Sequence, residues 1–411
     1  MSDLEEAVVL AAGSMTAILL QAAKICAHES RGRVGRFLRT RRAKGRFATD
    51  FEDIVKCEKR FVKYFHMPYK SFEDILRLIE PHLQPKKRTH PRDGISSKEK
   101  LAVVLEYLAS GTLQKHVASA YRISKQHFGT ILMDVCNAII KALKFEIPKL
   151  TQENLKETAK TFTKCNFPNC VGAMDGKQVF LKCPGNSGNF KGVFTLNIMA
   201  VADADYRFTY LDVGAYDKQN DSCMFSGSSI GADILNEELN FPGDIKMSDA
   251  TLPSVFVASD QFPLHQRIMT PYPSTLHKQP NEAVEIFNNR INRALLYAKN
   301  AFGILCSKFY CLSKKMFRCP NTAIKIIVTC FHLHNYLMRT VKLQYCPPKY
   351  WDRYDDDGSF VIGDYYKYIP ENSLFFTNFN STDMNKKYKS GDDVRNILKR
   401  FFNSDADSVM N

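Results

Sequence analysis

The sequence lacks the marks of several large protein classes. Its 12 cysteines form no CxxC pair, and the closest group, Cys306, Cys311 and Cys319, does not have zinc-finger spacing. The longest early apolar stretch, residues 7–20, is too short to cross a bilayer, and it follows acidic rather than basic residues. Phosphate-loop, G-x-S-x-G and H-E-x-x-H motifs are absent, as are repeats of fixed period. We therefore expect free thiols in a reducing compartment and an N-terminal helix over residues 7–20.

Length and composition are those of an ordinary globular protein. With 411 residues, 45% hydrophobic and 24% charged, the chain is long enough for two or three folding units. Lys and Arg number 57 against 43 Asp and Glu, which gives a formal charge of +14. This excess is compatible with a phosphate-rich partner, although a neutral enzyme can also have a basic surface.

Much of the positive charge lies in one early segment. Residues 31–46 contain eight Arg or Lys and no acid. Such runs are typical of solvated, disordered arms, and they also serve as nuclear import signals or as arms that follow DNA phosphates. These interpretations are compatible, because an arm can be disordered until it meets DNA. Residues 1–50 thus form an expected N-terminal helix and basic arm, and its DNA contacts would be Arg39, Arg41, Arg42 and Lys44.

Residues 51–150 show helical periodicity and a helix-turn-helix pattern. Ser96 begins a capping box before one predicted helix, and Gly111 ends that helix. A second short helix leads through a tight turn to a third helix capped at Ser124. In a helix-turn-helix, Lys125 and Gln126 would lie at the exposed start of the recognition helix and reach base edges. The alternative is an ordinary three-helix bundle whose polar positions face water.

From residue 165 the pattern changes to a mixed α/β domain. Short β-branched and aromatic runs come first, and two long helical patterns follow before residue 340. Residues 341–411 are rich in Tyr, Phe, Asn and Asp, and we expect a loosely ordered, acidic and aromatic tail with a short terminal helix.

Two aspartates have the same local context. Asp175 follows the apolar run VGAM, and Asp260 follows VFVAS. A carboxylate at the end of a buried strand is held rigidly, and two of them on neighbouring strands can bind Mg²⁺ or Mn²⁺ through oxygen. Such ions activate a nucleophile and stabilise the leaving oxygen in phosphoryl transfer. The alternative is that both residues merely begin turns, where aspartate is common.

Several blocks of this region resemble one family. They are VGAMDGKQVFLKCP, NSGNFKGVFTLNIMAVADADYRFTYLDVGAYDKQNDSCMF, VFVASDQFPLHQRIMTPYP, INRALLYAKNAFGIL and FHLHNYL, in that order. In order and approximate spacing they are similar to PIF/Harbinger-type transposases and the nucleases derived from them. The stretch RISKQHFGTI is similar to the helical segment that precedes the catalytic domain in that family. The resemblance implies an RNase H-like domain over 165–340 with two Asp and one Glu as metal ligands.

The resemblance does not extend to the third metal ligand. Asp175 matches the first ligand and Asp260 the second, but Lys299 stands where the family has Glu. No acid occurs from Ile286 to Trp351, and Glu285 lies fourteen residues earlier, about 21 Å along a helix. A lysine about 4 Å from a divalent ion would be repelled by roughly 8 kcal/mol at an effective dielectric of about 20. We expect Lys299 to turn to solvent or to pair with one of the two aspartates.

These observations leave three functional hypotheses. The first is a nuclear, DNA-binding protein of transposase descent, whose catalysis is weak or lost. The second is a working divalent-metal-dependent DNA endonuclease in which another residue replaces the third ligand. The third is a protein-interaction scaffold without nucleic-acid contact. The resemblance further implies a Myb-like or related DNA-binding partner protein, and a location in the nucleus, alone or together with the cytoplasm.

Overall fold

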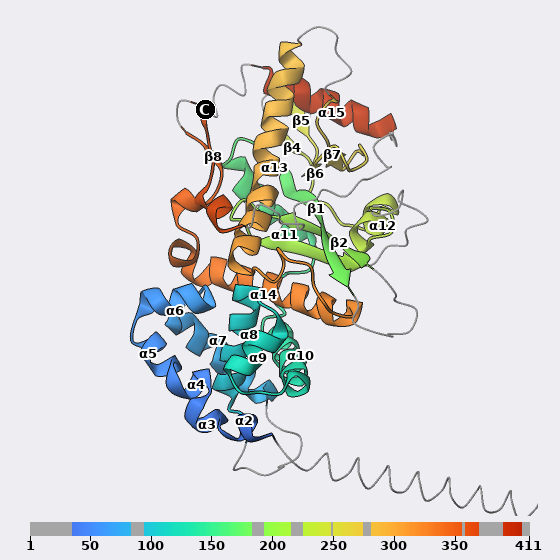
Figure 1. Ribbon diagram of the computed structural model, residues 1–411. Coiled ribbons are helices and arrows are strands. Elements are labelled where there is room, and N and C mark those ends of the chain that lie inside the picture. The colour runs from blue at the N-terminus through green and yellow to red at the C-terminus, as the bar shows by residue number, and fades with distance from the viewer. Residues whose placement is uncertain are drawn as a thin grey trace, which may run out of the picture.

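The computed structural model of the protein has a helical part and a part built on a central sheet. Figure 1 shows the helical part below and the sheet above it. The expected helix over residues 7–20 lies outside the described residues. The described ranges are 35–83, 94–182, 193–214, 225–247, 250–273, 281–355, 358–369 and 389–404.

The helical region comprises residues 35–142 of the described chain. Two of its helices begin at the predicted N-caps. Ser96 Oγ accepts a hydrogen bond from the Glu99 N–H at 3.1 Å, and Ser124 Oγ accepts one from the His127 N–H at 3.2 Å. The helices are α2 (Arg36–Arg39), α3 (Arg41–Lys44), α4 (Arg46–Thr49), α5 (Phe51–Val55), α6 (Glu58–Phe65), α7 (Tyr69–Leu83), α8 (Ser97–Ser110), α9 (Gln114–Ala120) and α10 (Lys125–Ala142).

A mixed five-stranded sheet forms the centre of the second part. Its order is β3-β2-β1-β6-β7, with antiparallel pairing from β3 to β1 and parallel pairing from β1 to β7. A small hairpin, β4 (Ile245–Met247) with β5 (Ala250–Leu252), lies apart from it. The strands of the main sheet are β1 (Cys170–Lys182), β2 (Val193–Ala202), β3 (Phe208–Gly214), β6 (Val255–Ala258) and β7 (Ile268–Met269).

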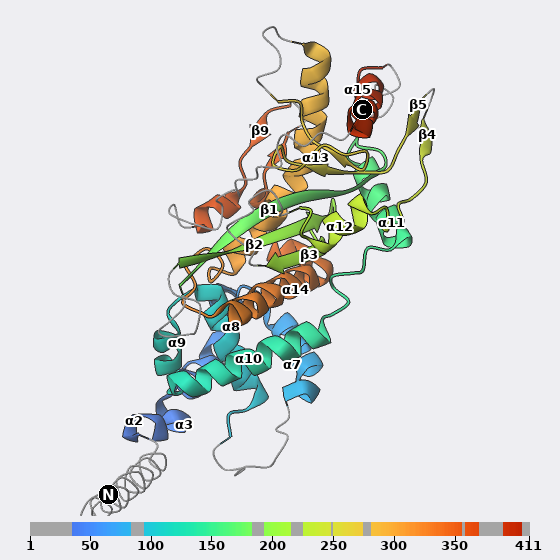
Figure 2. The same cartoon turned by 90° about the vertical axis from the view of Figure 1, so that its right-hand side faces the viewer.

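Helices cover both faces of this sheet. Figures 1 and 2 show α13 and α14 on one side of the strands and α11 and α12 nearer the other. The core is divided accordingly, because alternate residues of each strand enter two separate apolar clusters. This confirms the mixed α/β prediction for this part of the chain. The helices are α11 (Gln152–Thr163), α12 (Ser229–Leu235), α13 (Glu282–Lys308) and α14 (Pro320–Tyr345).

The expectation of a loosely ordered tail is wrong for the described residues after 341. Tyr345, Tyr350 and Tyr365 are buried in the main core. Gly303 of α13 permits close approach of the tail, because a Cβ there would lie 2.4 Å from the Tyr365 ring. Aromatic side chains bury large apolar areas, so a Tyr-rich segment can pack even without regular structure. The elements are η3 (Pro348–Tyr350), β8 (Arg353–Tyr354), β9 (Phe360–Val361), η4 (Asp364–Tyr368) and the predicted terminal helix α15 (Lys389–Phe402).

The two parts are packed together. Helix α14 lies between the sheet and α10 (Figure 2). The imidazole Nδ1 of His66 donates a hydrogen bond to the Lys308 carbonyl at the end of α13. Gly111 ends α8 with φ of +57°, and a Cβ there would lie 2.7 Å from the Tyr310 backbone. Glycine at 111 therefore serves both the helix end and this contact.

Candidate functional site

Asp175 lies within β1 rather than at its end. We expected the strand to end at Asp175, but it continues to Lys182 because Gly176 pairs with Met199 of β2 and does not interrupt the ladder. Met174 pairs with Ala258 of β6 in parallel register, so Asp175 lies beside the point where β6 ends. The carboxylate is 4% exposed.

The carboxylate of Asp175 forms an ion pair with a lysine from its own strand, although its Oδ2 accepts no hydrogen bond from the described residues. Lys177 Nζ lies 3.0 Å from Asp175 Oδ2, and the two side chains are 7% and 6% exposed. The Lys177 ammonium also lies 5.8 Å from the centroid of the Phe302 ring on α13. The other carboxylate oxygen, Oδ1, accepts the Gly176 N–H at 2.9 Å. Sequence reasoning missed Lys177, although residues i and i+2 of a strand share a face.

Asp260 is exposed in the turn that follows β6. Neighbouring strands lie about 4.8 Å apart, so the pairing of Met174 with Ala258 places the middle of β1, at Asp175, beside the end of β6, which Asp260 follows. Two buried oxygens flank Asp260, namely Ser259 Oγ and Gln261 Oε1, and neither has a hydrogen-bond partner in the described part of the chain.

Lys299 does not pair with either aspartate. Its side chain is exposed on α13, so of the two expected positions it takes the one in solvent. Helix α13 is continuous from Glu282 to Lys308, and Glu285 is exposed near its beginning. No shift of register therefore brings Glu285 to the position of Lys299.

These residues do not fit a two-metal site. Among the described residues, no three His, Cys, Asp or Glu side chains are grouped so that they could hold a metal ion. An ion bound to Asp175 would lie about 4 Å from the Lys177 ammonium and be repelled by roughly 8 kcal/mol at an effective dielectric of about 20. The oxygens beside Asp260 are suitable donors for a hard cation, but they do not offset that repulsion.

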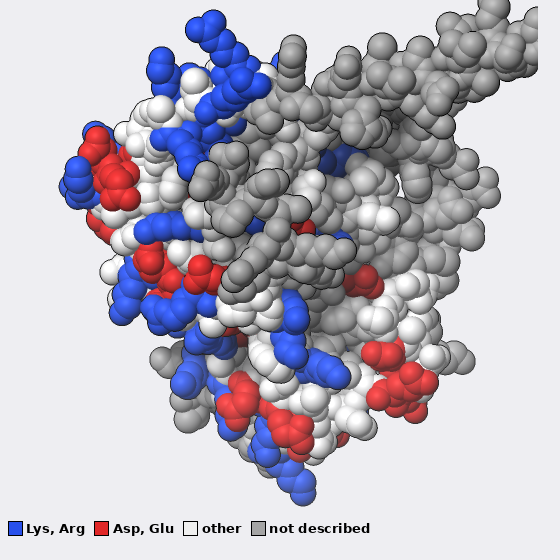
Figure 3. Space-filling model, turned by 90° about the horizontal axis from the view of Figure 1, so that it is seen from below, with Lys and Arg blue, Asp and Glu red and all other residues white. Residues whose placement is uncertain are grey.

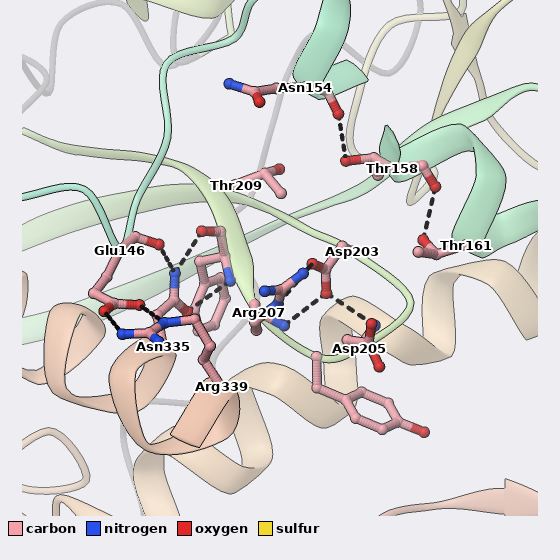
Figure 4. A network of polar contacts seen from close by, with 12 residues as sticks. Glu146, Asn154, Thr158, Thr161, Asp203, Asp205, Arg207, Thr209, Asn335 and Arg339 are labelled. Atoms are coloured by element: carbon pink, nitrogen blue, oxygen red, sulfur yellow. Dashed lines mark hydrogen bonds and ion pairs between the residues drawn. The ribbon is translucent and has the colours of Figure 1, made fainter. Parts of the chain in front are cut away.

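A cavity of about 460 Å³ lies between α11, the loop before it and the β2–β3 turn. Figure 4 shows two of its acids paired with arginines, Asp203 with Arg207 and Glu146 with Arg339. Asp203 is buried, which raises the pKa of its carboxyl, and it accepts hydrogen bonds from the Arg207 N–H and side chain at 2.9 and 3.1 Å. Arg339 pairs with Glu146 at 2.5 Å. Asp203 therefore holds a hairpin turn together.

The basic segment is folded over its described part, residues 35–46. This differs from the disordered arm that we expected, because two of its arginines pair with buried acids of α8. Arg41 lies 2.5 Å from Glu99 and is 13% exposed, and Arg46 pairs with Glu106. Arg39, Arg42 and Lys44 remain exposed, as required of residues expected to contact DNA. Residues 31–34 lie outside the described ranges.

Lys125 and Gln126 are exposed in the first turn of α10, where we expected them. The preceding turn contains Arg122, whose Nε donates to the Lys44 carbonyl at 3.0 Å and links this turn to the basic segment. Figure 3 shows the molecule from below, with Lys and Arg distributed over that face and interrupted by Asp and Glu. Positive charge there is frequent but does not form one continuous patch.

The imidazoles on α14 are structural. His334 is fully buried: Nε2 donates to the Tyr206 carbonyl at 2.8 Å and Nδ1 accepts the Tyr345 hydroxyl at 3.2 Å. Burial lowers the pKa of His334 to about 4, so the ring is neutral at physiological pH. His332 bonds its own helix, at the Val328 carbonyl.

Comparison with known proteins identifies one domain. Residues 174–335 match the family model of the DDE superfamily endonuclease, a segment that contains Asp175, Asp260 and Lys299. The match supports a transposase-derived family of DDE nucleases, whose domains generally use divalent metal ions. No curated protein and no solved structure matches the chain significantly. No helix in the described ranges has both the length and the apolar character to cross a membrane.

Proposed function

We propose that the protein is a nuclear, DNA-binding descendant of a PIF/Harbinger-type transposase, whose DDE-type nuclease domain has weak catalysis or none. One observation carries this proposal. Lys177 places a buried ammonium 3.0 Å from Asp175 Oδ2, the carboxylate that would have to hold the metal. A second lysine, the exposed Lys299, stands at the sequence position where the family has its third ligand.

The strand arrangement supports an RNase H-like domain. Three antiparallel strands are followed in the sheet by two parallel ones, and the long helix α13 packs against β1. Asp175 and Asp260 come from the adjacent strands β1 and β6, as the two aspartates of such a domain would. This strand arrangement is what the proposal requires of the scaffold, whereas the third acidic ligand is absent.

The helical region supplies the DNA contacts. Exposed Arg39, Arg42 and Lys44 would bind phosphates, whereas Lys125 and Gln126 at the start of α10 would read bases in a helix-turn-helix. Replacing both of the latter by Ala should cost about 1–3 kcal/mol on the preferred site and alter sequence preference. Unchanged preference in a selection from random duplexes would favour the plain three-helix bundle.

Nicking of supercoiled plasmid in Mg²⁺ or Mn²⁺ tests the loss of catalysis. We would compare the wild type with Asp175→Ala, Lys299→Glu and the double variant Lys177→Thr/Lys299→Glu. The proposal predicts little or no cutting by the wild type and the most cutting by the double variant, because only that variant removes both positive charges and restores an acid. Cutting by the wild type that is as strong as that of the double variant, and that Asp175→Ala abolishes, would overturn it.

The second candidate is an active nuclease with an unusual ligand set. It is favoured by the unpartnered oxygens of Ser259 and Gln261 on either side of Asp260. In that case the wild type should cut DNA and Asp260→Ala should not. The Lys177 side chain would then have to move away from Asp175 for a metal ion to bind.

The proposal includes a DNA-binding partner protein. As in the family that the sequence resembles, a Myb-like or related DNA-binding protein would assist entry into the nucleus and targeting. Co-purification of such a protein from nuclear extract, lost on deletion of residues 35–46, would support a role of the basic segment in that contact.

A further inference from the structure

A second cavity lies where α13, the β2–β3 turn and the segment before β8 meet. Its volume is about 300 Å³, and its walls include the rings of Tyr206, Tyr297, Trp351 and Tyr354. The Tyr206 and Tyr297 rings are stacked, with centroids 5.4 Å apart, and the Trp351 centroid lies 5.1 Å from that of Tyr206. Both views show the β8–β9 hairpin alongside α13 (Figures 1 and 2).

The rim of this cavity is positively charged. The Arg293 guanidinium lies over the Tyr354 ring, 4.7 Å from its centroid, and the Arg293 side chain is exposed. No ion pair joins Arg293 to an acid in the described part of the chain, whereas Arg353 pairs with Asp355 at 3.1 Å. Lys164 is exposed beside Cys165, another wall residue. An anionic group at the mouth of the cavity would therefore be attracted.

The polar groups of the floor are already satisfied. Asn300 Nδ2 donates to the Asp352 carbonyl at 2.8 Å, and the Asp352 N–H donates back to Asn300 Oδ1 at 2.9 Å. The Asp352 carboxylate accepts the Gly363 N–H at 2.7 Å and the Tyr365 hydroxyl at 3.0 Å. The floor thus offers few free donors or acceptors, so a ligand would be held by stacking and by charge.

Aromatic walls suit two kinds of ligand, a flat base or a methylated ammonium group. A cation is disfavoured, because the exposed Arg293 lines the cavity and the Lys342 ammonium already lies 5.7 Å from the Tyr206 centroid. A base with a phosphate satisfies both the rings and the positive rim. We infer that this cavity binds an unstacked base of single-stranded DNA, with little preference between bases. The inference rests on the proposed function and extends it.

Trp351 makes the inference directly measurable, because it is the only tryptophan of the chain and lines the cavity. A base stacked near it should quench its fluorescence. We would titrate the full chain with a short oligothymidylate, with an abasic oligonucleotide of the same length, and with thymidine monophosphate. The expected result is quenching by the oligothymidylate, weak quenching by the mononucleotide and none by the abasic strand.

Single substitutions distinguish DNA binding in the cavity from nonspecific attraction of DNA by positive charge. Tyr354→Ala and Arg293→Gln should each weaken oligothymidylate binding, measured by anisotropy, the former by roughly five- to hundredfold. Arg400→Gln removes the same charge from the exposed face of α15 and should leave binding unchanged. Thermal unfolding of each variant checks that it folds.

Three results would overturn the inference. Equal binding of abasic and thymidylate strands would show attraction by charge alone. Quenching by a trimethyl-lysine peptide but not by DNA would assign the cavity to a cation. Mononucleotide binding as tight as that of the strand would assign it to a free nucleotide. A duplex oligonucleotide titrated alongside keeps the two proposals apart. Duplex binding by the wild type leaves the proposed function standing, whereas a wild type that binds neither duplex nor single strand defeats the proposed function itself.

Discussion

The helical region and the sheet region bury acidic side chains in opposite ways. In the helical region, Glu99 and Glu106 of α8 pair with Arg41 and Arg46, which lie 58 and 60 residues earlier. In the sheet region, Asp175 pairs with Lys177 two residues later on the same strand. The pairs in the helical region join segments that are distant in sequence, whereas the pair in the sheet region joins two residues of one strand.

The difference shows that the number of charges in a segment does not tell how many are free. Residues 31–46 contain eight Arg or Lys, yet Arg41 and Arg46 are used to hold the segment on α8. Conversely, an aspartate in a domain that matches an endonuclease family model is not a free ligand when an ammonium lies 3.0 Å away. The same interaction, a buried ion pair, is structural in the first region and opposes metal binding in the second.

The largest expected effect comes from breaking the pair in the sheet. Lys177→Met leaves the Asp175 carboxylate buried without a partner, which should lower the free energy of unfolding by about 3–5 kcal/mol. The double variant Lys177→Met/Asp175→Leu should recover most of this loss, because an apolar pair needs no neutralisation. Urea unfolding measures both, with exposed Lys299→Met as the matched control. A double variant no more stable than the single one would contradict the ion-pair interpretation.

Acid should weaken the sheet region through His334. The pKa of its imidazole is about 4 in the folded protein, against 6.5 in the unfolded chain, so the unfolded chain binds more protons between these values. The contribution of His334 to stability is complete above pH 6.5 and should fall by about 3 kcal/mol as the pH drops to about 4. The partly buried His66, whose pKa is also about 4, acts in the same range. In His334→Gln this part of the pH dependence should disappear. The same slope in wild type and variant would assign the acid sensitivity to other groups.

A smaller effect is expected from the pair in the helical region. Arg46→Ala leaves Glu106 with only the Tyr121 hydroxyl, which donates to it at 2.8 Å. Because Arg46 is 30% exposed, water can replace part of the lost interaction, and we expect a loss of about 2 kcal/mol. Lys56→Ala, at a fully exposed pair with Asp53, should change stability by less than about 0.5 kcal/mol. Equal losses of stability in Arg46→Ala and Lys56→Ala would mean that burial does not decide how much these ion pairs contribute.

The smallest effect separates three exposed charges of the basic segment from Arg41, which pairs with Glu99. Neutralising Arg39, Arg42 and Lys44 together should weaken DNA binding on all sequences alike and reduce the salt slope by up to about three. Adding Arg41→Gln should mainly lower stability, because Glu99 then loses its partner. An unchanged salt slope for the triple variant would exclude the segment from DNA contact.

Much of the fold could be predicted where local signals agree. The caps at Ser96 and Ser124, the end of α8 at Gly111 and the long helices α13 and α14 depend on nearby residues and matched the structure. The prediction that a strand ends at Asp175 was wrong, because pairing with β2 carries the strand through Gly176. The described residues of the tail differ from the loosely ordered segment that we expected, because their tyrosines are buried in a core built by other elements.

The sequence by itself determined that the expected third carboxylate is absent, since no acid occurs from Ile286 to Trp351. It also determined the succession of a helical and an α/β region, because periodicity and caps are local properties. Only the tertiary structure decided that Lys177 pairs with Asp175, that Arg41 and Arg46 are engaged, and that Trp351 lines a cavity with Tyr206 and Tyr297. The physical reason is that burial and ion pairing depend on which segments pack together. That packing is set by the whole core and not by any single stretch of sequence.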